Sequence, residues 1–349
     1  MRRRHRILCL VVALGLVPWG AGHAWADRNG RRILFSAYGD NTAYHVFSVR
    51  LDGTGLTKLS RRGGGFDPAW SSDGRRIAYV QFGEGIVVMR KDGSHRGLVT
   101  KHGSTPQWSP DDSRLLFTRW CCDEFQRSSG VFVARPDGTR IRRLAHTLSR
   151  RRVSSASWSP DGRLVSYIRT PTRCSLTRCV RDKLFLVSRR GGDETLLFRR
   201  DGIHSYDWSP DGSRIVVSCR CGRDQDDLYV IDVSSGKATR ITDTPGSEAE
   251  PDWSPSGDEV LALRWRADFS GAAKLIRLST EGSSEVTVAS RLRESPSPSW
   301  SPNGARIVFL RYFRGVRTME VFVIDADGTD ETRVTDDRLD QVGPSWQPR

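Results

Sequence analysis

Trp158-Ser159-Pro160-Asp161-Gly162, with close copies at 208–212 and 300–304, is the stretch that indicates the fold of this chain. Related segments bring the set to seven tryptophans: Trp70, Trp108, Trp158, Trp208, Trp253, Trp300 and Trp346. Successive tryptophans lie 38, 50, 50, 45, 47 and 46 residues apart. A repeat of this length, with short apolar runs between turns, is typical of radially repeated β-structure.

Each repeat contains four short apolar runs, and the unit that begins at Trp208 shows them well. Its tryptophan strand leads through a Ser-Pro-Asp-Gly turn, in which proline and glycine suit the backbone angles required, into a strand at 215–217. Further strands are expected at 228–231 and 238–242. The sequence therefore predicts an all-β chain, a seven-bladed β-propeller of four-stranded antiparallel blades.

The two ends of the chain carry complementary halves of one repeat. Residues 29–35 match the second half of the hairpin at 73–79, but no tryptophan precedes them. The segment 344–348, which contains Trp346, supplies the missing first half. We therefore expect N/C-terminal strand closure, which removes free sheet edges. A decayed eighth repeat, or a six-bladed ring with one unit displaced, is the alternative.

These Trp-Ser-Pro-Asp-Gly units resemble the repeats of TolB-type, or WD40-like, β-propeller proteins. The resemblance covers residues 31–346 and departs from the motif at Ser72, at Asp112 and at Ser256. It implies a propeller that binds partners in the cell envelope. TolB proper has an α/β domain before a six-bladed propeller, whereas strand-like sequence here follows the leader directly. The resemblance is therefore to the propeller only, without the TolB N-terminal domain.

The first 26 residues differ from the rest of the chain. Four arginines and His5 at 2–6 precede an apolar stretch at 7–17, and Ala24-Trp25-Ala26 is a small-x-small cleavage signal. We predict a signal peptide at 1–26, cleaved near Ala26, and a single propeller domain at 27–349. The mature protein is then exported, to the periplasm or the extracellular space. An uncleaved anchor is the alternative, and no later segment is apolar enough to span a membrane.

Six cysteines remain after this cleavage, and they fall between the second and third strands of three successive repeats: Cys121, Cys122, Cys174, Cys179, Cys219 and Cys221. In an exported protein such a set predicts disulfides that link neighbouring loops. A thiolate metal site is the alternative, and all fifteen pairings stay open. We otherwise expect no metal and no cofactor.

The formal net charge is +14, and +10 remains after the four leader arginines are removed. Arginine outnumbers lysine in every repeat, which we interpret as a solvated basic surface. No motif interleaves basic and aromatic residues, so nucleic acid is not an expected partner. The expected partner is a protein or a cell-envelope polymer, bound by a monomer.

Signatures of catalysis are missing from the sequence: there is no Gly-x-Ser-x-Gly elbow, phosphate loop or His-Glu-x-x-His pair. The acidic stretch 325–330 occupies an ordinary turn and lacks the glutamate of a calcium loop. Polar residues that precede the tryptophans are expected to surround the mouth of the central channel and to bind a ligand: Asp67, Gln107, His204, Tyr206, Glu248, Glu250 and Gln341.

The sequence thus favours a non-catalytic recognition scaffold that binds through a propeller face. Some propellers with this type of repeat are metal-dependent sugar-acid lyases, so a carbohydrate-active lyase or hydrolase with a site in the central funnel is the alternative. The enzyme hypothesis requires His102, His146 or His204 to converge with carboxylates.

Overall fold

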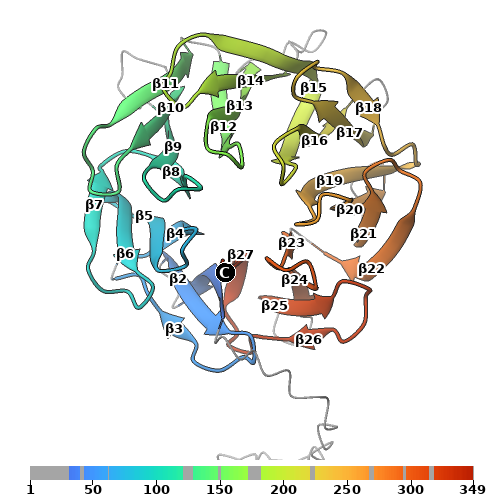
Figure 1. The fold of residues 1–349 in the computed structure, drawn as a ribbon. Helices are drawn as coiled ribbons and strands as arrows, with labels where there is room; N and C mark the ends of the chain where they lie inside the picture. The colour runs from blue at the N-terminus through green and yellow to red at the C-terminus, as the bar shows by residue number, and fades with distance from the viewer. Residues whose placement is uncertain are drawn as a thin grey trace, which may run out of the picture.

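The computed structural model describes residues 31–39, 43–61, 63–120, 129–147, 151–171, 182–220, 225–266, 271–293, 296–313 and 318–348. These residues form seven four-stranded antiparallel blades arranged as a ring (Figure 1). No helix occurs among them. The predicted seven-bladed β-propeller is confirmed.

Blade 1 is the blade that joins the two ends of the chain, and blades 2 to 7 follow in sequence order. From blade 1 to blade 7 the innermost strands are β27 (Asp340–Trp346), β4 (Gly65–Trp70), β8 (Ser104–Trp108), β12 (Arg151–Trp158), the second half of β15 (Glu194–Trp208), β19 (Gly246–Trp253) and β23 (Ser299–Trp300). The second strands are β1 (Arg32–Gly39), β5 (Arg76–Gln81), β9 (Leu115–Trp120), β13 (Leu164–Pro171), β16 (Arg214–Arg220), β20 (Glu259–Arg266) and β24 (Arg306–Phe313).

The third strands are β2 (Ala43–Arg50), β6 (Gly85–Arg90), β10 (Ser129–Ala134), β14 (Asp182–Ser188), β17 (Asp226–Asp232), β21 (Ala273–Ser279) and β25 (Thr318–Asp325). The outermost strands are β3 (Thr57–Lys58), β7 (Gly97–Thr100), β11 (Arg142–Thr147), the first half of β15, β18 (Ala238–Arg240), β22 (Glu285–Leu292) and β26 (Thr332–Arg333). One strand, β15, therefore ends blade 4 and begins blade 5, pairing first with β14 and then with β16.

The ring is closed by the C-terminal strand, which lies beside the first strand of the chain (Figure 1). β27 pairs antiparallel with β1, and Trp346 lies opposite Ile33. The backbone N–H of Gln347 also donates to the Arg32 carbonyl at 2.9 Å. The predicted terminal closure is confirmed, and the decayed eighth repeat and the six-bladed ring are not observed.

The seven motif tryptophans pack between blades, as their repeated position predicts. Each is between 5% and 8% exposed. Trp108 of blade 3 belongs to a cluster with Val80 and Val88 of blade 2, and Trp346 of blade 1 packs with Leu310 and Val323 of blade 7. Burial of large aromatic surfaces between neighbours stabilises a fold whose units cannot bury their faces alone.

The turn after each tryptophan is held by its own side chains. In blade 5 the Ser209 hydroxyl donates to Asp211 at 2.6 Å and accepts the N–H of Arg214 at 2.9 Å. Asp211 also accepts the N–H of Ser213. These hydrogen bonds, chiefly the one from Ser209, lower the pKa of Asp211 to about 2. The motif therefore encodes a self-supporting hairpin turn.

Two departures from the motif meet across one blade boundary. At four other boundaries the motif glycine faces the motif proline of the preceding blade; a Cβ on Gly212, for example, would lie 3.5 Å from Cδ of Pro160. Between blades 2 and 3, Ser72 replaces the proline and Asp112 replaces the glycine. The Asp112 carboxylate accepts the N–H of Ser72 at 2.7 Å and that of Asp73 at 2.9 Å. Because proline has no N–H, the two departures form a matched pair.

Many arginines serve the blade interfaces, which the expectation of a solvated basic surface did not foresee. The Arg76 guanidinium lies 4.4 Å from the ring centroid of Trp108 in the next blade, and Arg214 lies 5.0 Å from that of Trp253. Arginines also stack on aromatic pairs within single blades. The Arg169 guanidinium, for example, lies 4.3 Å from the centroid of the Phe185 ring, which is paired with Tyr167. Arginine suits these positions because its planar cation stacks on aromatic faces.

Candidate functional site

The two faces of the ring differ in what they present. Each innermost strand ends at its tryptophan, so the motif turns all lie on one face, which we call the turn face. In antiparallel blades the connections from second to third strands lie at the opposite ends of the strands. We call that side the loop face. The predicted channel-mouth residues are spread along the innermost strands, from Gln341 near the start of β27 to Gln107 directly before Trp108.

In three blades the side chain of the residue directly before the tryptophan accepts a backbone N–H from the next blade. The Gln107 side chain accepts the backbone N–H of Trp158 at 3.0 Å. Asp207 accepts the N–H of Trp253 at 2.8 Å, and Asp252 accepts that of Trp300 at 2.7 Å. Gln107, one of the predicted channel residues, is therefore engaged in holding blade 3 to blade 4.

A β-bulge interrupts several innermost strands three residues before the tryptophan. Asp67 and Glu250 occupy this position with φ of 51° and 53°, a conformation uncommon for residues other than glycine. Burial raises the pKa of both carboxyl groups, and a hydrogen bond from the backbone of the next blade, at Thr105 or Ser297, partly offsets the rise. These two predicted residues lie on innermost strands, Asp67 in β4 and Glu250 in β19.

Asp207 and Asp252 form a pair of neighbouring carboxylates on the channel wall. Burial raises the pKa of Asp207 to about 6. Burial, together with repulsion from Asp207, holds the pKa of Asp252 well above its ordinary value. Asp207 still accepts the N–H of Trp253, and Asp252 that of Trp300. The pair therefore links neighbouring blades and is also a source of electrostatic repulsion at neutral pH.

Three other predicted residues are occupied by contacts within the fold. Glu248 is fully buried, and its Oε1 accepts the Arg264 Nε–H at 2.6 Å. Gln341 is also fully buried and accepts the backbone N–H of Val321 at 2.9 Å. The Tyr206 hydroxyl donates to the carbonyl of Ser155 in the neighbouring blade, and burial raises its pKa.

The remaining predicted residue, His204, opens onto a cavity on the loop face. The cavity has a volume of about 320 Å³ and lies where blades 5 and 6 meet. It is lined by residues from β15, β16, β17 and β19: His204, Ser205, Arg220, Asp226, Ala249 and Glu250. The structure thus brings together two of the residues predicted from the sequence, His204 and Glu250.

Asp226 is the buried acidic residue against which the two basic residues of this cavity lie. Its side chain is 1% exposed, yet neither carboxylate oxygen has a hydrogen-bond partner among the described residues. His204 Nε2 lies 3.5 Å from Oδ2, and Arg220 Nε lies 3.7 Å from Oδ1. Both cations are half exposed. The Asp226 carboxylate raises the pKa of His204, and burial partly opposes this.

The same position in other blades shows what is unusual about Asp226. Ser129 and Asp182 also stand near the start of a third strand. The Ser129 hydroxyl accepts the N–H of Val153 at 2.8 Å, and Asp182 accepts the N–H of Ile203 at 3.0 Å, each from the next innermost strand. The carboxylate of Asp226 makes no such bond. Its charge is held beside the cavity instead.

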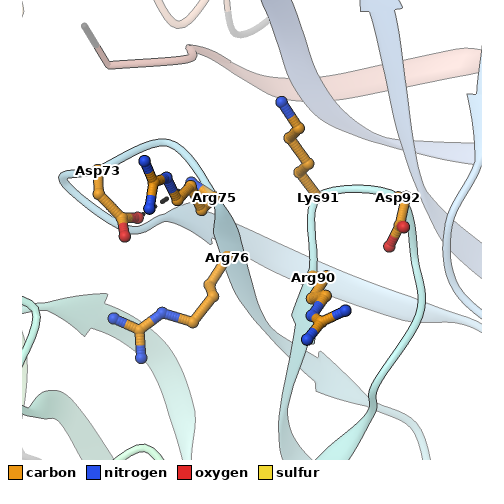
Figure 2. Close-up of a pocket in the computed structure, with 6 residues that line it drawn as sticks. All are labelled: Asp73, Arg75, Arg76, Arg90, Lys91 and Asp92. Atoms are coloured by element: carbon orange, nitrogen blue, oxygen red, sulfur yellow. Dashed lines mark hydrogen bonds between the residues drawn. The ribbon is translucent and has the colours of Figure 1, made fainter.

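A second cavity, of about 370 Å³, lies on the turn face of blade 2 and is lined by Asp73, Arg75, Arg76, Arg90, Lys91 and Asp92. Figure 2 shows that Lys91 points away from Arg76 and Arg90, so the cationic groups do not converge on one point. No buried polar group takes part. This cavity has the character of a charged surface between two turns.

The three histidines that the enzyme hypothesis requires lie in different parts of the blades. His102 lies in the connection from β7 to β8, His146 lies in the outermost strand β11, and His204 lies in the innermost part of β15. Within the described ranges, no group of three or more histidine, cysteine or acidic residues could hold a metal ion. His204 and Asp226 nevertheless form one histidine–carboxylate pair.

Two other predictions concern particular segments. The acidic stretch at 325–330 is a turn, in which Gly328 donates its N–H to the Asp325 carbonyl at 2.9 Å, so the expected turn is confirmed. Cys219 lies buried in β16. Cys121, Cys122, Cys174, Cys179 and Cys221 lie outside the described residues. In the part of the chain that is described, no helix is long and apolar enough to cross a membrane.

Sequence reasoning missed four residues that shape these sites. Asp207 and Asp252 carried a usable signal, because each is the first residue of an Asp-Trp pair within the repeat. Arg220 and Asp226 carried none, because they flank a connection whose length varies between repeats.

Comparison with known proteins agrees with this architecture. The model of the TolB beta propeller domain family matches residues 201–349. This part of the chain is similar to TolB-type β-propellers. The TolB protein of the Tol-Pal system from Francisella tularensis is 35% identical over 87 residues, which are 25% of this chain and 20% of that protein. An uncharacterised protein of Agrobacterium fabrum is 30% identical over 176 residues, 47% of this chain and 58% of that protein.

Enzymes share this β-propeller fold. The crystal structure of oligogalacturonate lyase from Vibrio parahaemolyticus matches with a TM-score of 0.68 and 14% identity, over 85% of this chain and 86% of that chain. At this identity the likeness concerns the fold alone. The chain also spans less than two thirds of the length of the curated relatives named above.

Proposed function

We propose that this TolB-type propeller is an exported recognition scaffold that binds a protein or a cell-envelope polymer through its loop face, without catalysis of its own. In this proposal residues 1–26 are a signal peptide, and residues 27–349 form one domain that acts as a monomer in the periplasm or outside the cell. The positive charge of the mature chain favours association with acidic envelope components.

One observation supports the proposal most strongly: the loop face has a cavity lined by charged side chains that remain partly exposed to solvent. Gln107, Asp207 and Asp252 each clasp a neighbouring tryptophan N–H. By contrast, the half-exposed Arg220 and His204, which flank the buried Asp226 carboxylate at 3.7 Å and 3.5 Å, open onto the cavity. Concave sites with a few convergent polar groups on a rigid frame are typical of ligand binding.

The dispersed histidines support binding rather than catalysis. A metal-dependent lyase needs several ligands around one ion, and the described residues bring no such group together. The pair formed by His204 and Asp226, at 3.5 Å, is what keeps a sugar-acid lyase or hydrolase as the second candidate. Oligogalacturonate supplied with Mn²⁺, followed by ultraviolet absorbance of an unsaturated product, tests it. Turnover that His204→Gln abolishes would establish the enzyme.

Disulfides are proposed to brace the loop face. Their support is that Cys219, in β16 directly before the cavity residue Arg220, is disulfide-bonded. Oxidised loops on neighbouring blades would hold the binding face rigid outside the reducing cytosol. A mass map of non-reduced peptides that finds all six cysteines as thiols would remove this part of the proposal.

Capture of partners from the organism's own envelope tests the binding role. The mature chain serves as bait, beside a loop-face variant (His204→Ala with Arg220→Ala) and a turn-face control (Arg90→Ala with Lys91→Ala). We expect mass spectrometry to find a partner with the wild type and the control, and at least tenfold less with the loop-face variant. Equal capture by all three baits, or none, contradicts binding through the loop face.

A further inference from the structure

We infer that the loop-face cavity between blades 5 and 6 binds the C-terminal carboxylate of a peptide chain, and that Arg220 and His204 are the side chains that hold this carboxylate. The inference rests on the proposed recognition function and names a ligand class for it. With a volume of about 320 Å³, the cavity has room for the last residue of a chain rather than for a folded segment.

Asp226 positions the two basic side chains and takes no part in ligand contact. Its carboxylate oxygens are buried, and its side chain is 1% exposed. His204 Nε2 and Arg220 Nε lie 3.5 Å and 3.7 Å from these oxygens, longer than an ordinary N–H···O hydrogen bond but close enough for attraction between charges. Antiparallel pairing of β16 with β17 places Arg220 directly opposite Asp226. The buried acid therefore holds both cations at the cavity without using up their donors.

Arg220 keeps its donors available to a ligand. Its side chain is 49% exposed, and no described residue accepts a hydrogen bond from its guanidinium. Other arginines of second strands are used within the fold: Arg169 and Arg311 each donate to a glutamate at 2.7 Å and are only 15% and 22% exposed. A guanidinium presents its N–H groups as a fork that matches the two oxygens of a carboxylate. Arg220 is thus open to the carboxylate of a ligand.

His204 and Ser205 add donors on the same wall of the cavity. The His204 side chain is 52% exposed, and the Asp226 carboxylate raises its pKa, so the ring keeps its positive charge to higher pH than an isolated histidine does. The Ser205 hydroxyl accepts the backbone N–H of Glu250 at 3.2 Å, which leaves its own proton to donate. A carboxylate in the cavity can therefore accept from a guanidinium, an imidazolium and a hydroxyl.

The balance of charge selects a ligand with one negative charge. Arg220 and protonated His204 carry two positive charges, and the buried Asp226 offsets one of them. A carboxylate neutralises the charge that remains, whereas a phosphate monoester, with a charge of about −1.5 to −2 at neutral pH, exceeds it. Burial raises the pKa of Glu250, which lines the same cavity, so this carboxyl group takes up a proton more readily than an exposed glutamate when an anion enters.

The acceptors of the cavity favour a peptide over an acidic sugar. Since Asp226 is covered, Glu250 is the one carboxyl group among the described lining residues that a ligand can contact. The backbone N–H of Ser297 occupies part of its accepting capacity, and the rest suits one further donor. A peptide has a single N–H close to its C-terminal carboxylate, whereas a sugar acid carries several hydroxyl donors that would all need partners. Ala249 adds a small apolar contact for the terminal side chain.

Nuclear magnetic resonance on the mature full chain tests the inference. Acetyl-alanyl-alanine, which has a free C-terminal carboxylate, is titrated beside its C-terminal amide, and sodium glucuronate and inorganic phosphate serve as comparison probes. Histidine ring signals are followed, and a His204→Gln variant identifies those of His204. We expect the free-acid peptide to shift the His204 signals saturably. The amide should leave them unchanged at equal concentration, and glucuronate and phosphate should bind at least about tenfold more weakly.

Arg220→Gln is expected to raise the dissociation constant of acetyl-alanyl-alanine about tenfold to hundredfold, because it removes charge-assisted hydrogen bonds to the carboxylate. Arg90→Gln, in the turn-face cavity, is the matched control and should leave binding unchanged. Circular dichroism and the melting temperature verify folding. Arg220→Lys keeps the charge but loses the fork, so it should weaken binding a few-fold, and it provides a second variant should Arg220→Gln not fold. A dissociation constant that neither Arg220 variant changes would overturn the inference.

Failure of the inference is distinguishable from failure of the proposed function. Equal shifts with the peptide and its amide would show that the carboxylate is not recognised. Tighter binding of glucuronate or phosphate than of the peptide would reassign the cavity to an acidic sugar or to phosphate, and would likewise overturn the inference. No shift with any probe would overturn it too, whereas envelope capture that depends on the loop face would still support the recognition role. Loss of both signals would overturn both.

Discussion

The contact between Ser72 and Asp112 makes a quantitative prediction about how the blades are joined. Asp112→Gly removes two hydrogen bonds to the turn of blade 2, with N···O distances of 2.7 Å and 2.9 Å. Because the site is exposed to solvent, we assign each bond about 1 kcal/mol, below the usual range for charged acceptors. Relief of the positive φ of Asp112, 55°, returns about 1 kcal/mol, the lower end of the range for a residue other than glycine. The single variant should therefore lose about 1 kcal/mol in its free energy of unfolding.

Ser72→Pro removes one of the two bonds and restricts the unfolded chain, so it should be close to neutral, within about 1 kcal/mol. In the double variant the removed N–H no longer needs an acceptor, and proline faces glycine as it does at four other boundaries. We expect a coupling energy of about 1 kcal/mol in favour of the double variant, measured by urea unfolding of all four proteins in a double-mutant cycle.

The reverse exchange provides a control at a boundary that follows the motif. Gly212→Asp places a carboxylate against Pro160, which has no N–H to donate, and should destabilise the chain; adding Pro160→Ser should recover part of the loss. Free energies that add within about 0.5 kcal/mol in both cycles would refute the reasoning, because independent sites behave in that way.

Two further predictions concern buried charges. A raised carboxyl pKa in the folded state stabilises the fold below the ordinary pKa and loses that contribution as pH rises through the folded value, about 6 for Asp207. Asp207→Asn keeps an acceptor for the Trp253 N–H and removes the repulsion with Asp252. The free energy of unfolding of the variant, relative to that of the wild type, should therefore rise by about 1–2 kcal/mol between pH 5 and pH 8. If thermal melts show a difference that does not change with pH, repulsion between Asp207 and Asp252 does not affect stability. Arg264→Met should lower the free energy of unfolding by about 3–5 kcal/mol, because it leaves the fully buried Glu248 without its cation. The double variant with Glu248→Gln should recover part of this loss in thermal melts. No recovery would mean that Arg264 stabilises the fold through packing alone.

Much of the fold was predictable because its signals are local and repeated. A tryptophan followed by a turn recurs seven times, and the complementary ends could be matched by inspection. The same inspection identified Ser72 and Asp112 as departures from the motif. It could not show that they touch, because they lie 40 positions apart in the sequence and meet only when blades 2 and 3 pack together.

The candidate site was only partly predictable for a related reason. His204 and Glu250 were identified from their position before a tryptophan, but so were Glu248 and Gln341, which the fold buries. A bulge shifts the alternation of side chains in the innermost strands, so sequence position alone does not fix which side chains face the channel. The arrangement of His204 and Arg220 around the buried Asp226 depends on how β15, β16 and β17 pair, and no sequence pattern records it.

Closure of the ring by β27 is the central claim, since every position on the two faces depends on it. Hydrogen–deuterium exchange of residues 32–39 in the mature chain, compared with a variant that ends at residue 339, tests it most directly. We predict slow exchange across β1 in the intact protein and fast exchange of the same peptide after truncation, because β27 pairs along β1 from Ile33 to Tyr38. Equal protection of residues 32–39 in both proteins would contradict the closure.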